Sequence, residues 1–447
     1  MEQDLTTGSV FKRIVYFSLP YLLSYFLQTL YGMADLFITG QFYGVDTITA
    51  VSNGSQIMHM MTVIIVGLAM GTTVTIGHSV GAKCMEQAEK IIGNTITLFM
   101  GIVVAFTVIL VVLVKPIVVL IAAPQEAVAG TSIYLLICFI GIPFITAYNI
   151  ISSIFRGLGD SKSPMYFIGI ACVMNIALDY LFMGAFHMGA AGAALGTVCA
   201  QTFSLLVALW VIRRRKTGIS LKKSDFKIER AVIGQVLKIG IPVALQDGFI
   251  QVAFMIITVI ANSRGVSDAA AVGVVEKVIS ALFIVPSSML ATVSALSAQN
   301  LGAGKEKRAT DTLHYATVIT TIYGMIVAVL IQFIAENVVG IFTSDTTVVT
   351  MGSAYIRSYI WDCIFAGIHF SFSGYFAACG KSYIGFLHNI ISITFVRVPG
   401  SYLASKYFTD TLYPMGLAAP AGSLVSVAIC VTAFILLKRK SRVAQTA

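Results

Sequence analysis

Charged residues are scarce in this sequence. Asp, Glu, Lys and Arg make up 11% of the 447 residues, against roughly 25% in a typical soluble domain, whereas 57% of the residues are hydrophobic. Apolar stretches of about 20 residues, the length that crosses a bilayer as a helix, recur along the whole chain and leave no polar block large enough for a soluble domain. The scarcity of charge therefore excludes a soluble protein and predicts an all-α integral membrane protein.

Several catalytic motifs are also missing. The seven cysteines are scattered, form no C-x-x-C pair and stand in no cluster with metal-ligand spacing, so we interpret them as small buried hydrophobes. No phosphate loop of the Walker type is present, which argues against an ATP-driven pump acting by itself. The chain also lacks the dense aspartate motif that a membrane prenyltransferase needs to hold magnesium. We therefore predict that the protein is not an enzyme and has no resident metal or cofactor.

The net charge of +9 could suggest nucleic-acid binding, but the basic residues flank the apolar spans. They gather at Arg213 to Lys216, at Lys222, Lys223, Lys227 and Arg230, at 305 to 308, and at 438 to 442. Such clusters are typical of cytoplasmic loops, and the loops on the other side hold little beyond Lys115, Arg264 and Lys406. We predict a multi-pass protein of the cell membrane with both termini in the cytoplasm and no nucleic-acid partner.

The apolar stretches predict twelve transmembrane spans. They run over 14 to 39, 48 to 77, 91 to 114, 131 to 154, 164 to 184, 190 to 212, 233 to 261, 270 to 298, 313 to 335, 352 to 378, 383 to 405 and 416 to 437. The predicted parts are an amino-terminal six-helix lobe (1–212), a basic cytoplasmic linker (213–232), a carboxy-terminal six-helix lobe (233–437) and a basic tail (438–447).

A repeat of about 221 residues relates the two lobes. Pairs at this offset include Gly44 with Gly265, Ala50-Val51 with Ala271-Val272, Gly81-Ala82 with Gly302-Ala303, Ala88 with Ala309, Tyr134 with Tyr355, Phe155 with Phe376, and Gly159 with Gly380. Because each repeat has an even number of spans, the two lobes have the same orientation in the membrane. This arrangement predicts a central cavity between two bundles, as in alternating-access transporters.

The stretch from Phe155 to Asp179 contains the first candidate for chemistry. Its glycines, Asp160 and Pro164 predict a tight loop between two apolar helices. Asp179 then lies in an apolar span, with Asn175 one helical turn before it on the same face. Ionisable side chains inside membrane spans are costly and commonly functional, so we expect these two residues to belong to an ion or substrate site.

The ordered motifs of the chain resemble those of the multidrug and toxic compound extrusion (MATE) family, prokaryotic type. They are Ser-Leu-Pro ending at Pro20, Leu-Tyr-Gly-Met-Ala-Asp ending at Asp35, Val-Gly-Ala at 80 to 82, Asn-Leu-Gly-Ala at 300 to 303, Arg-Gly-Leu-Gly-Asp at 156 to 160 and Asn-Ile-Ala-Leu-Asp at 175 to 179. The resemblance covers nearly the whole chain. It implies a two-lobed exporter that exchanges organic cations or other amphiphiles for protons or sodium.

The resemblance also implies a polar cluster in the amino-terminal lobe. The matching positions are Asp35, Tyr134, Asn175, Asp179 and Thr197. Burial and a second carboxylate both favour the protonated form of an acid, so Asp35 and Asp179 can share a proton; Na⁺ bound by Asp35, Asn175, Asp179 and Thr197 is the alternative. We expect ion binding to change the packing of the first helix, where Pro20 removes a backbone hydrogen bond and allows bending.

Charged residues in the second half are weaker candidates. Glu276 and Asp247 are second-tier candidates for the cavity, and Glu276 resembles an acid found on the eighth helix of some family members. The chain departs from the sodium-type pattern of that lobe, because Ile250 stands where those members place a Glu. Arg397 is interpreted either as an anchor near a helix end or as a partner inside the bundle.

A flippase for lipid-linked saccharides, from the same superfamily, is the alternative function. Such proteins have strongly cationic cavities for pyrophosphate, whereas the first-half spans here carry acids and almost no bases. A channel or receptor fits the repeat and the mid-membrane acids less well. The expected partners are small organic cations or drugs and the lipid bilayer, and nothing in the sequence requires more than a monomer.

Overall fold

Helices occupy all twelve predicted spans in the computed structural model, which describes residues 4 to 121, 123 to 214 and 220 to 446. The first six spans are α1 (Val10–Phe42), α2 (Val45–Gly81), α3 (Met85–Leu120), α4 (Val128–Gly157), α5 (Lys162–Asp179) continued by η1 (Tyr180–Ala185), and α6 (Gly189–Arg214). The short η2 (Lys223–Phe226) precedes the second set. Arg215 and Lys216 of the predicted linker lie outside the described residues.

The last six spans include several divided helices. They are α7 (Arg230–Asn262), α8 (Val266–Leu282) with α9 (Ile284–Gly302), α10 (Glu306–Gly340), α11 (Thr346–Tyr359) with α12 (Asp362–Ala378), α13 (Tyr383–Ser392) with η3 (Ile393–Arg397) and α14 (Val398–Tyr407), and α15 (Tyr413–Gly416) with α16 (Ala418–Thr446). The described residues contain no strand. The prediction of an all-α membrane protein with twelve transmembrane helices is confirmed.

Nine helical segments of the described chain are each long and apolar enough to cross a membrane by themselves. The predicted spans 352 to 378 and 383 to 405, which correspond to α11 with α12 and to α13 with η3 and α14, are not among these nine. α1 is not among them either, although it is one continuous helix of 33 residues. Its polar residues, among them Gln28 and Asp35, lower its hydropathy, and both of them line a cavity described below.

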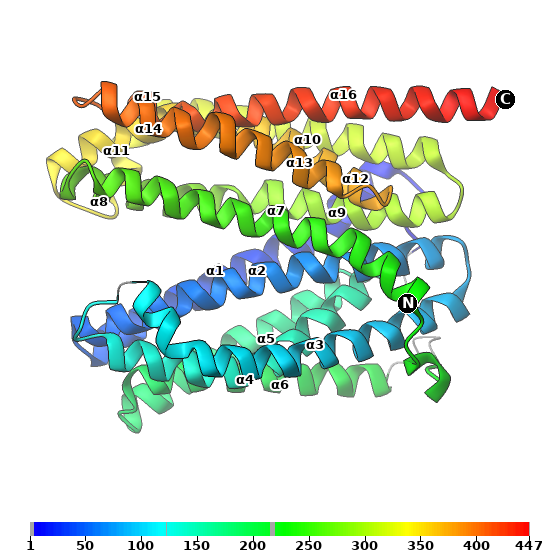
Figure 1. Ribbon diagram of the computed structural model, residues 1–447, viewed down its shortest axis with the longest axis horizontal. Helices are drawn as coiled ribbons and strands as arrows, with labels where there is room; N and C mark the ends of the chain where they lie inside the picture. Colours follow the sequence, from blue (N-terminus) through cyan, green and yellow to red (C-terminus); the bar gives the residue numbers. More distant parts are fainter. Residues whose placement is uncertain (1–3, 122, 215–219, 447) are drawn as a thin grey trace. The chain divides into compact units, whose positions relative to one another are not determined.

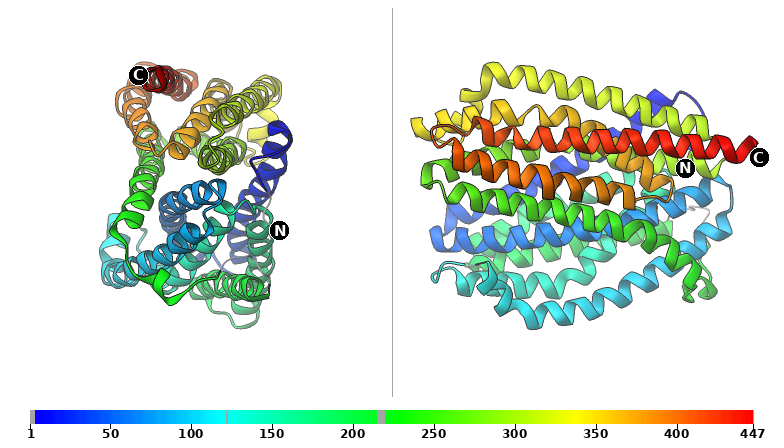
Figure 2. Two further views of the ribbon diagram at one scale, coloured as in Figure 1. Left: turned by 90° about the vertical axis from the view of Figure 1, so that its right-hand side faces the viewer. Right: turned by 45° about the horizontal axis from the view of Figure 1, so that its top comes forward.

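The helices group into two units by their internal contacts. Unit 1 is built chiefly from Tyr16–Ala244, and unit 2 from Leu245–Leu301 and Lys305–Ala447. In each unit the long helices lie side by side (Figure 1, Figure 2). The predicted domain boundaries stay a prediction.

A glycine turn recurs at the same place in both repeats. At the end of α4, Asp160 N donates to Phe155 O over 2.9 Å and Gly159 has φ +92°; at the end of α12, Lys381 N donates to Phe376 O over 2.8 Å and Gly380 has φ +67°. This is the Schellman arrangement, which pairs the last carbonyls of a helix and requires a left-handed residue. The predicted tight loop after Phe155 is therefore present, and its backbone is repeated 221 residues later.

Side-chain caps complete the first of these loops. Asp160 Oδ1 accepts hydrogen bonds from the backbone N–H groups of Lys162 and Ser163, both over 3.0 Å, and its Oδ2 accepts one from Ser163 Oγ over 2.6 Å. The donors at the start of α5 are thereby satisfied close to its first turn. This cap fixes where α5 starts and hence the helical positions of Asn175 and Asp179.

The described part of the predicted linker packs against α3. Ser220 N donates to Glu89 Oε1 over 2.6 Å, and Asn94 donates through Nδ2 to Asp225 O over 3.1 Å. Asn94 Oδ1 also accepts from Glu229 N over 2.6 Å. Because buried backbone groups need partners, these bonds hold the segment before α7 to unit 1.

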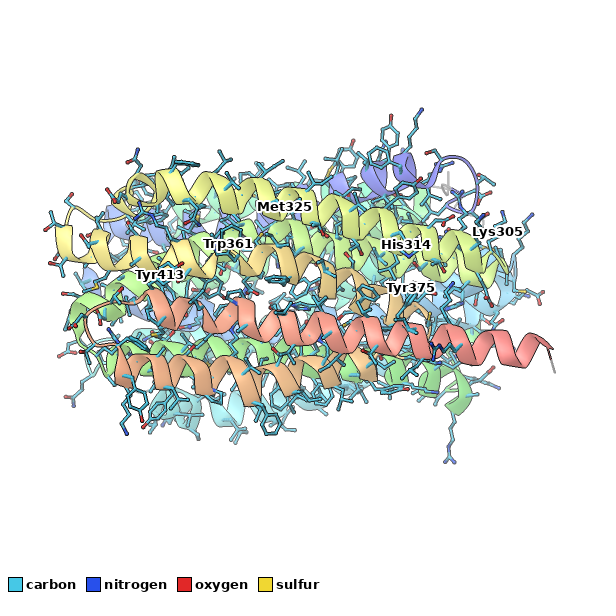
Figure 3. All side chains as sticks on the ribbon, turned by 90° about the horizontal axis from the view of Figure 1, so that it is seen from above. Lys305, His314, Met325, Trp361, Tyr375 and Tyr413 are labelled. Carbon is cyan, nitrogen blue, oxygen red and sulfur yellow. The ribbon has the colours of Figure 1, made fainter. Side chains whose placement is uncertain are left out.

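Aromatic contacts join three helices within unit 2. The ring centroid of Phe434 in α16 lies 6.4 Å from that of His314 in α10 and 5.7 Å from that of Tyr375 in α12. Figure 3 shows His314 and Tyr375 towards the same end of this bundle as Lys305, with Tyr413 at the other end. Edge-to-face contacts of this kind add to the burial of apolar area and orient the helices that carry them.

The repeated turn makes a prediction about Gly380. An added Cβ at Gly380 would meet no atom within 4 Å, so Gly380→Ala tests the left-handed backbone alone. We expect a loss of about 1 kcal/mol, seen as a lower melting temperature of the purified protein in detergent. Gly101→Ala, in the exposed interior of α3, is the control and should be neutral or stabilising. Equal melting temperatures for wild type and Gly380→Ala would contradict this account.

Candidate functional site

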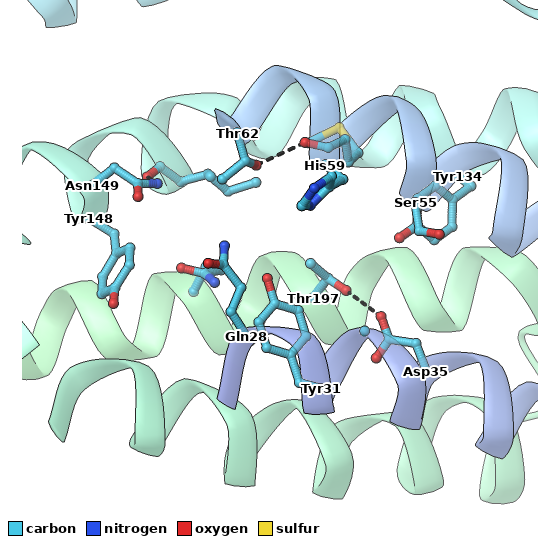
Figure 4. A pocket seen from close by; sticks show the side chains of 14 residues that line it. Gln28, Tyr31, Asp35, Ser55, His59, Thr62, Tyr134, Tyr148, Asn149 and Thr197 are labelled. Carbon is cyan, nitrogen blue, oxygen red and sulfur yellow. Dashed lines mark hydrogen bonds between the residues drawn. The ribbon is translucent and has the colours of Figure 1, made fainter. Parts of the chain in front are cut away.

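A cavity of about 100 Å³, with many polar side chains on its wall, lies inside unit 1. Its lining comes from α1, α2, α4 and α6, and Figure 4 shows these side chains facing one another. The lining residues are Gln28, Tyr31, Gly32, Asp35, Ser55, Met58, His59, Thr62, Tyr134, Ile145, Tyr148, Asn149, Thr197 and Gln201. Asp35 is the carboxylate of this set, which contains no Lys or Arg, so the cavity suits a cation better than an anion.

Asp35 carries the charge of the cavity. Its side chain is 2% exposed, and Thr197 Oγ1 of α6 donates to its Oδ2 over 3.3 Å (Figure 4). Its other carboxyl oxygen, Oδ1, is buried and has no hydrogen-bond partner in the described part of the chain. A buried carboxylate that is only half satisfied is costly, and a proton or a cation would relieve this cost.

The end of α1 is fixed against the loop that leads into α6. Thr39 Oγ1 donates to Asp35 O over 2.6 Å, one turn after Asp35. Further along, Tyr43 OH donates to Met183 O over 3.1 Å and accepts from Gly189 N over 2.9 Å. The two bonds of Tyr43 hold the end of the helix that carries Asp35 against η1 and the start of α6.

Asn175 and Asp179 of α5 interact with Asp35 but do not line the cavity. Both are buried, with 2% and 0% of their surfaces exposed. Neither polar atom of the Asn175 amide and neither carboxyl oxygen of Asp179 has a hydrogen-bond partner among the described residues. With Asp35 Oδ1, the group therefore contains five buried polar atoms without a hydrogen-bond partner among the residues that the structure describes.

A glycine of α6 makes room for the Asp179 carboxyl. A Cβ built on Gly196 would lie 2.1 Å from Asp179 Oδ1, far inside van der Waals contact. Gly196 precedes Thr197, so two consecutive positions of α6 face the two acids. The close approach explains how α5 and α6 pack together with a carboxyl group between them.

Tyr134 of α4 belongs to the same site. It is 2% exposed, lines the cavity and packs its ring against α2, where a Cβ on Gly54 would lie 2.2 Å from its Cδ1. All five predicted residues of the amino-terminal lobe thus lie in one region of unit 1: Asp35, Tyr134 and Thr197 on the cavity wall, and Asn175 and Asp179 beside Asp35.

The other predicted residues lie elsewhere. Glu276 and Asp247 belong to unit 2; Glu276 Oε2 accepts from Thr258 Oγ1 over 3.3 Å, and Asp247 is half-buried. Pro20 lies within α1, which continues through it as one helix. Ser24 Oγ donates to the Pro20 carbonyl over 2.7 Å. Bending at Pro20 stays a prediction.

Sequence reasoning missed several polar residues of the cavity, notably Gln28, Tyr31, His59, Asn149 and Gln201. Part of the signal was available, because Gln28, Tyr31 and Asp35 are spaced three and four residues apart and so share one face of α1. The other residues come from α2, α4 and α6, and only the packing of these helices reveals that they share a space.

A family model named MatE matches residues 20–181 and 242–403, which is one match for each repeat and together most of the chain. The chain belongs to the MatE family. Membership in this family confirms the resemblance to MATE transporters and makes the chain a multi-pass transporter of the plasma membrane and not an enzyme. The MatE matches begin at Pro20 and Pro242, the prolines of the first helix of each repeat.

Individual MatE relatives are similar over nearly their full lengths. A probable multidrug resistance protein of Bacillus subtilis, YpnP, is 29% identical, with 93% of each chain covered. A second from the same organism, YoeA, is 25% identical, covering 95% of this chain and 93% of its own. A solved structure described as the outward-facing conformation of a multidrug resistance MATE family transporter has a TM-score of 0.91 at 20% identity, covering 100% of this chain and 99% of its own. That structural likeness confirms the MatE fold.

The packing at Gly196 predicts a specific coupling between two substitutions. Gly196→Ala should destabilise the purified protein by about 1–3 kcal/mol, because the new methyl group overlaps the Asp179 carboxyl. The same substitution should cost much less in an Asp179→Ala background, where the carboxyl is gone. Melting curves of the four proteins in detergent measure this.

Gly169→Ala in α5 is the matched control. Its added Cβ would lie 3.8 Å from Leu27 Cδ1, an ordinary contact, so no coupling with Asp179→Ala is expected. If Gly196→Ala costs the same with and without the Asp179 carboxyl, the two groups are not in contact.

Proposed function

We propose that this MatE-family protein is a secondary active multidrug exporter. It antiports organic cations or other amphiphilic compounds against H⁺, or Na⁺, by alternating access, with coupling at Asp35 and Asp179. The observation that carries the proposal is the half-satisfied Asp35 carboxylate on the wall of a cavity, beside a second buried carboxyl. The names of the relatives, multidrug resistance proteins, support the substrate class.

The unsatisfied atoms favour an exchangeable ion. An isolated ionised carboxylate in an apolar region costs at least a few kcal/mol, so binding of a proton or a cation stabilises the ion-loaded state. Two neighbouring acids share a proton readily, because their negative charges repel when both are ionised. Asp35 and Asp179 have this relation, which supports proton coupling.

The same residues also fit sodium. Asp35, Asn175, Asp179 and Thr197 present carboxylate, amide and hydroxyl oxygens, which are the donors that hard cations prefer. The Thr197 hydroxyl donates its proton to Asp35 and keeps its lone pairs for a ligand. Bound Na⁺ would supply positive charge to the two carboxylates, whereas the protein residues orient the oxygens and exclude lipid.

The volume of the cavity is large enough for an ion but too small for a drug. At about 100 Å³ it is well below the roughly 300–1,000 Å³ of a site for a drug-sized ligand. A drug therefore requires a conformation in which this space opens, while a proton or Na⁺ fits the present one. An ion and an organic cation that select different conformations of the same acidic site give antiport.

The wall of the cavity supports cationic substrates. Tyr31 and Tyr134 lie near the Asp35 carboxylate, and Tyr148 adds a third aromatic ring at the other end of the cavity (Figure 4). Aromatic faces attract organic cations by about 0.5–2 kcal/mol each, depending on hydration. The absence of Lys and Arg from the lining residues argues against the lipid-linked saccharide flippase, since pyrophosphate needs positive charge.

We further propose that the protein works as a monomer with both termini in the cytoplasm. The excess of Lys and Arg in the loops on the terminal side of the membrane supports this orientation. The predicted coupling would then use an inward gradient of H⁺ or Na⁺ to drive efflux.

Asp35→Asn tests the coupling directly. In proteoliposomes, wild type should move a fluorescent organic cation in response to one imposed gradient, H⁺ or Na⁺, and Asp35→Asn should reduce that gradient-driven transport at least about tenfold, because an amide neither releases a proton nor attracts a cation. Asp46→Asn, at an exposed carboxylate of α2, is the control and should transport like wild type.

The outcomes separate the candidate functions. Wild-type activity under one gradient identifies the ion. Gradient-driven transport that survives in Asp35→Asn would make Asp35 structural and overturn the coupling site. A wild type that moves no organic cation under either gradient but flips a lipid-linked saccharide would replace the exporter by the flippase.

Thr197→Val tests the hydrogen bond to Asp35. Valine keeps the volume but removes the donor to Asp35 Oδ2, so we expect the pH or Na⁺ dependence of transport to shift while the protein remains folded. Thr202→Val on the same helix is the control, since the Thr202 hydroxyl donates to Val198 O within α6. Identical ion dependence in Thr197→Val and wild type would show that this bond does not tune the site.

A further inference from the structure

Unit 2 contains a buried charged cluster around Arg397 that the proposed function does not use. Arg397 ends η3 and is 9% exposed. Two acids interact with it electrostatically: Glu276 of α8 and Asp362 of α12, of which Asp362 is 1% exposed. A guanidinium inside a transmembrane bundle is rare and needs partners, so the contacts of Arg397 show what the cluster is built to hold.

The Arg397 guanidinium has contacts of the kind that a protein makes with a bound organic cation. Its Nη2 donates to the Tyr359 hydroxyl, and its central carbon lies 4.8 Å from the ring centroid of Phe254 and 5.6 Å from that of Tyr359. Two aromatic faces with carboxylates near them form the kind of surroundings that recognise organic cations. Neither Glu276 nor Asp362 makes a direct ion pair with Arg397, and Arg397 Nε has no hydrogen-bond partner in the described chain.

The internal repeat places this cluster at the position of the unit 1 cavity. Subtracting the offset of 221 from 355 and 276 gives 134 and 55, and 397 corresponds to 176 at this offset or to 175 at the offset of 222 between Pro20 and Pro242. Tyr134 and Ser55 line the cavity, and Ile176 lies next to Asn175 in α5. Tyr355 interacts electrostatically with both Glu276 and Arg397, so the equivalent tyrosines stand beside an acid in each unit.

The two equivalent positions differ in one respect. In unit 1 the acids are Asp35 and Asp179; together with Asn175 they have five buried polar atoms without a hydrogen-bond partner in the described part of the chain, and no Lys or Arg lines the cavity. In unit 2 the acids face a permanent positive charge that is covalently part of the chain. Arginine does not lose its proton in proteins, so this charge does not leave.

We propose that Arg397 is a tethered cation that occupies, in unit 2, the site which takes an exchangeable cation in unit 1. The carboxy-terminal lobe is then not an ion-exchanging site, and Glu276 and Asp362 serve to neutralise Arg397. The comparison with unit 1 depends on the proposed function, whereas the occupied site in unit 2 is tested below without any transport measurement.

Removal of the tethered cation should create a binding site for a free one. Purified Arg397→Ala in detergent should melt roughly 5 °C or more below wild type, because it leaves two buried acids uncompensated. Guanidinium chloride, added at up to about 50 mM at constant ionic strength, should raise its melting temperature with a saturable dose dependence. Wild type should show no such rise.

Matched variants separate binding from general salt effects. Arg357→Ala removes a half-exposed guanidinium that pairs with the exposed Glu336 of the same unit over 3.3 Å, so it should melt near wild type and show no response to guanidinium. In the triple variant Arg397→Ala, Glu276→Gln, Asp362→Asn, the stability should recover in part and the response to guanidinium should disappear.

Two results would overturn the proposal. The first is an Arg397→Ala protein that guanidinium does not stabilise, or stabilises no more than it does Arg357→Ala. The second result needs no Arg397 variant, so it decides the case if Arg397→Ala fails to fold. It is a saturable stabilisation of the wild-type protein by Na⁺ that persists in Asp35→Asn but is lost in Glu276→Gln. That result would make the acids of unit 2 an exchangeable ion site. If Na⁺ gives no stabilisation that depends on Glu276, the tethered cation is supported. Transport by Asp35→Asn, whether lost or retained, bears on the proposed function and does not change either conclusion about unit 2.

Discussion

A carboxylate in the hydrocarbon region needs a positive partner, and the interior of this protein is arranged around that requirement. Water cannot satisfy a charge there, so each buried acid must find a proton, a cation or a donor within the bundle. In unit 1 the protein supplies one clear donor to Asp35, the Thr197 hydroxyl, and leaves Asp179 without a hydrogen bond in the described chain. The helices around these acids are packed closely enough that only a small ligand can complete the site.

Close packing also limits how the site can change. Gly196 brings α6 against the Asp179 carboxyl, and Tyr43 ties the end of α1 to the residues before α6. Densely packed interfaces do not deform continuously. We therefore expect that a change in the charge of the acids moves whole helices. The helix α1 is the natural candidate, since it carries Asp35 and contains a proline.

Much of the fold followed from the sequence, because hydrophobic length and internal repetition are local or periodic signals. The apolar runs predicted all twelve spans, and the glycine and Asp160 of the loop after Phe155 predicted a turn that the structure contains. The cavity wall was predicted only in part, because Gln28 and Gln201 lie far apart in sequence and meet through helix packing. For Arg397 the sequence left an anchor and an interior partner open, since the neighbours that decide between them come from α7, α8, α11 and α12.

The paired Schellman turns allow the chain to serve as its own comparison. Gly159 and Gly380 are both glycine because the backbone at each position has a positive φ, which other residues rarely adopt. A residue that both repeats share at such a position is therefore required by the fold. Positions such as Ile176 and Arg397, which differ at the same offset, report what each half does separately. The two bundles thus share a design but differ at their centres, where one has two buried acids and the other has buried acids beside an arginine.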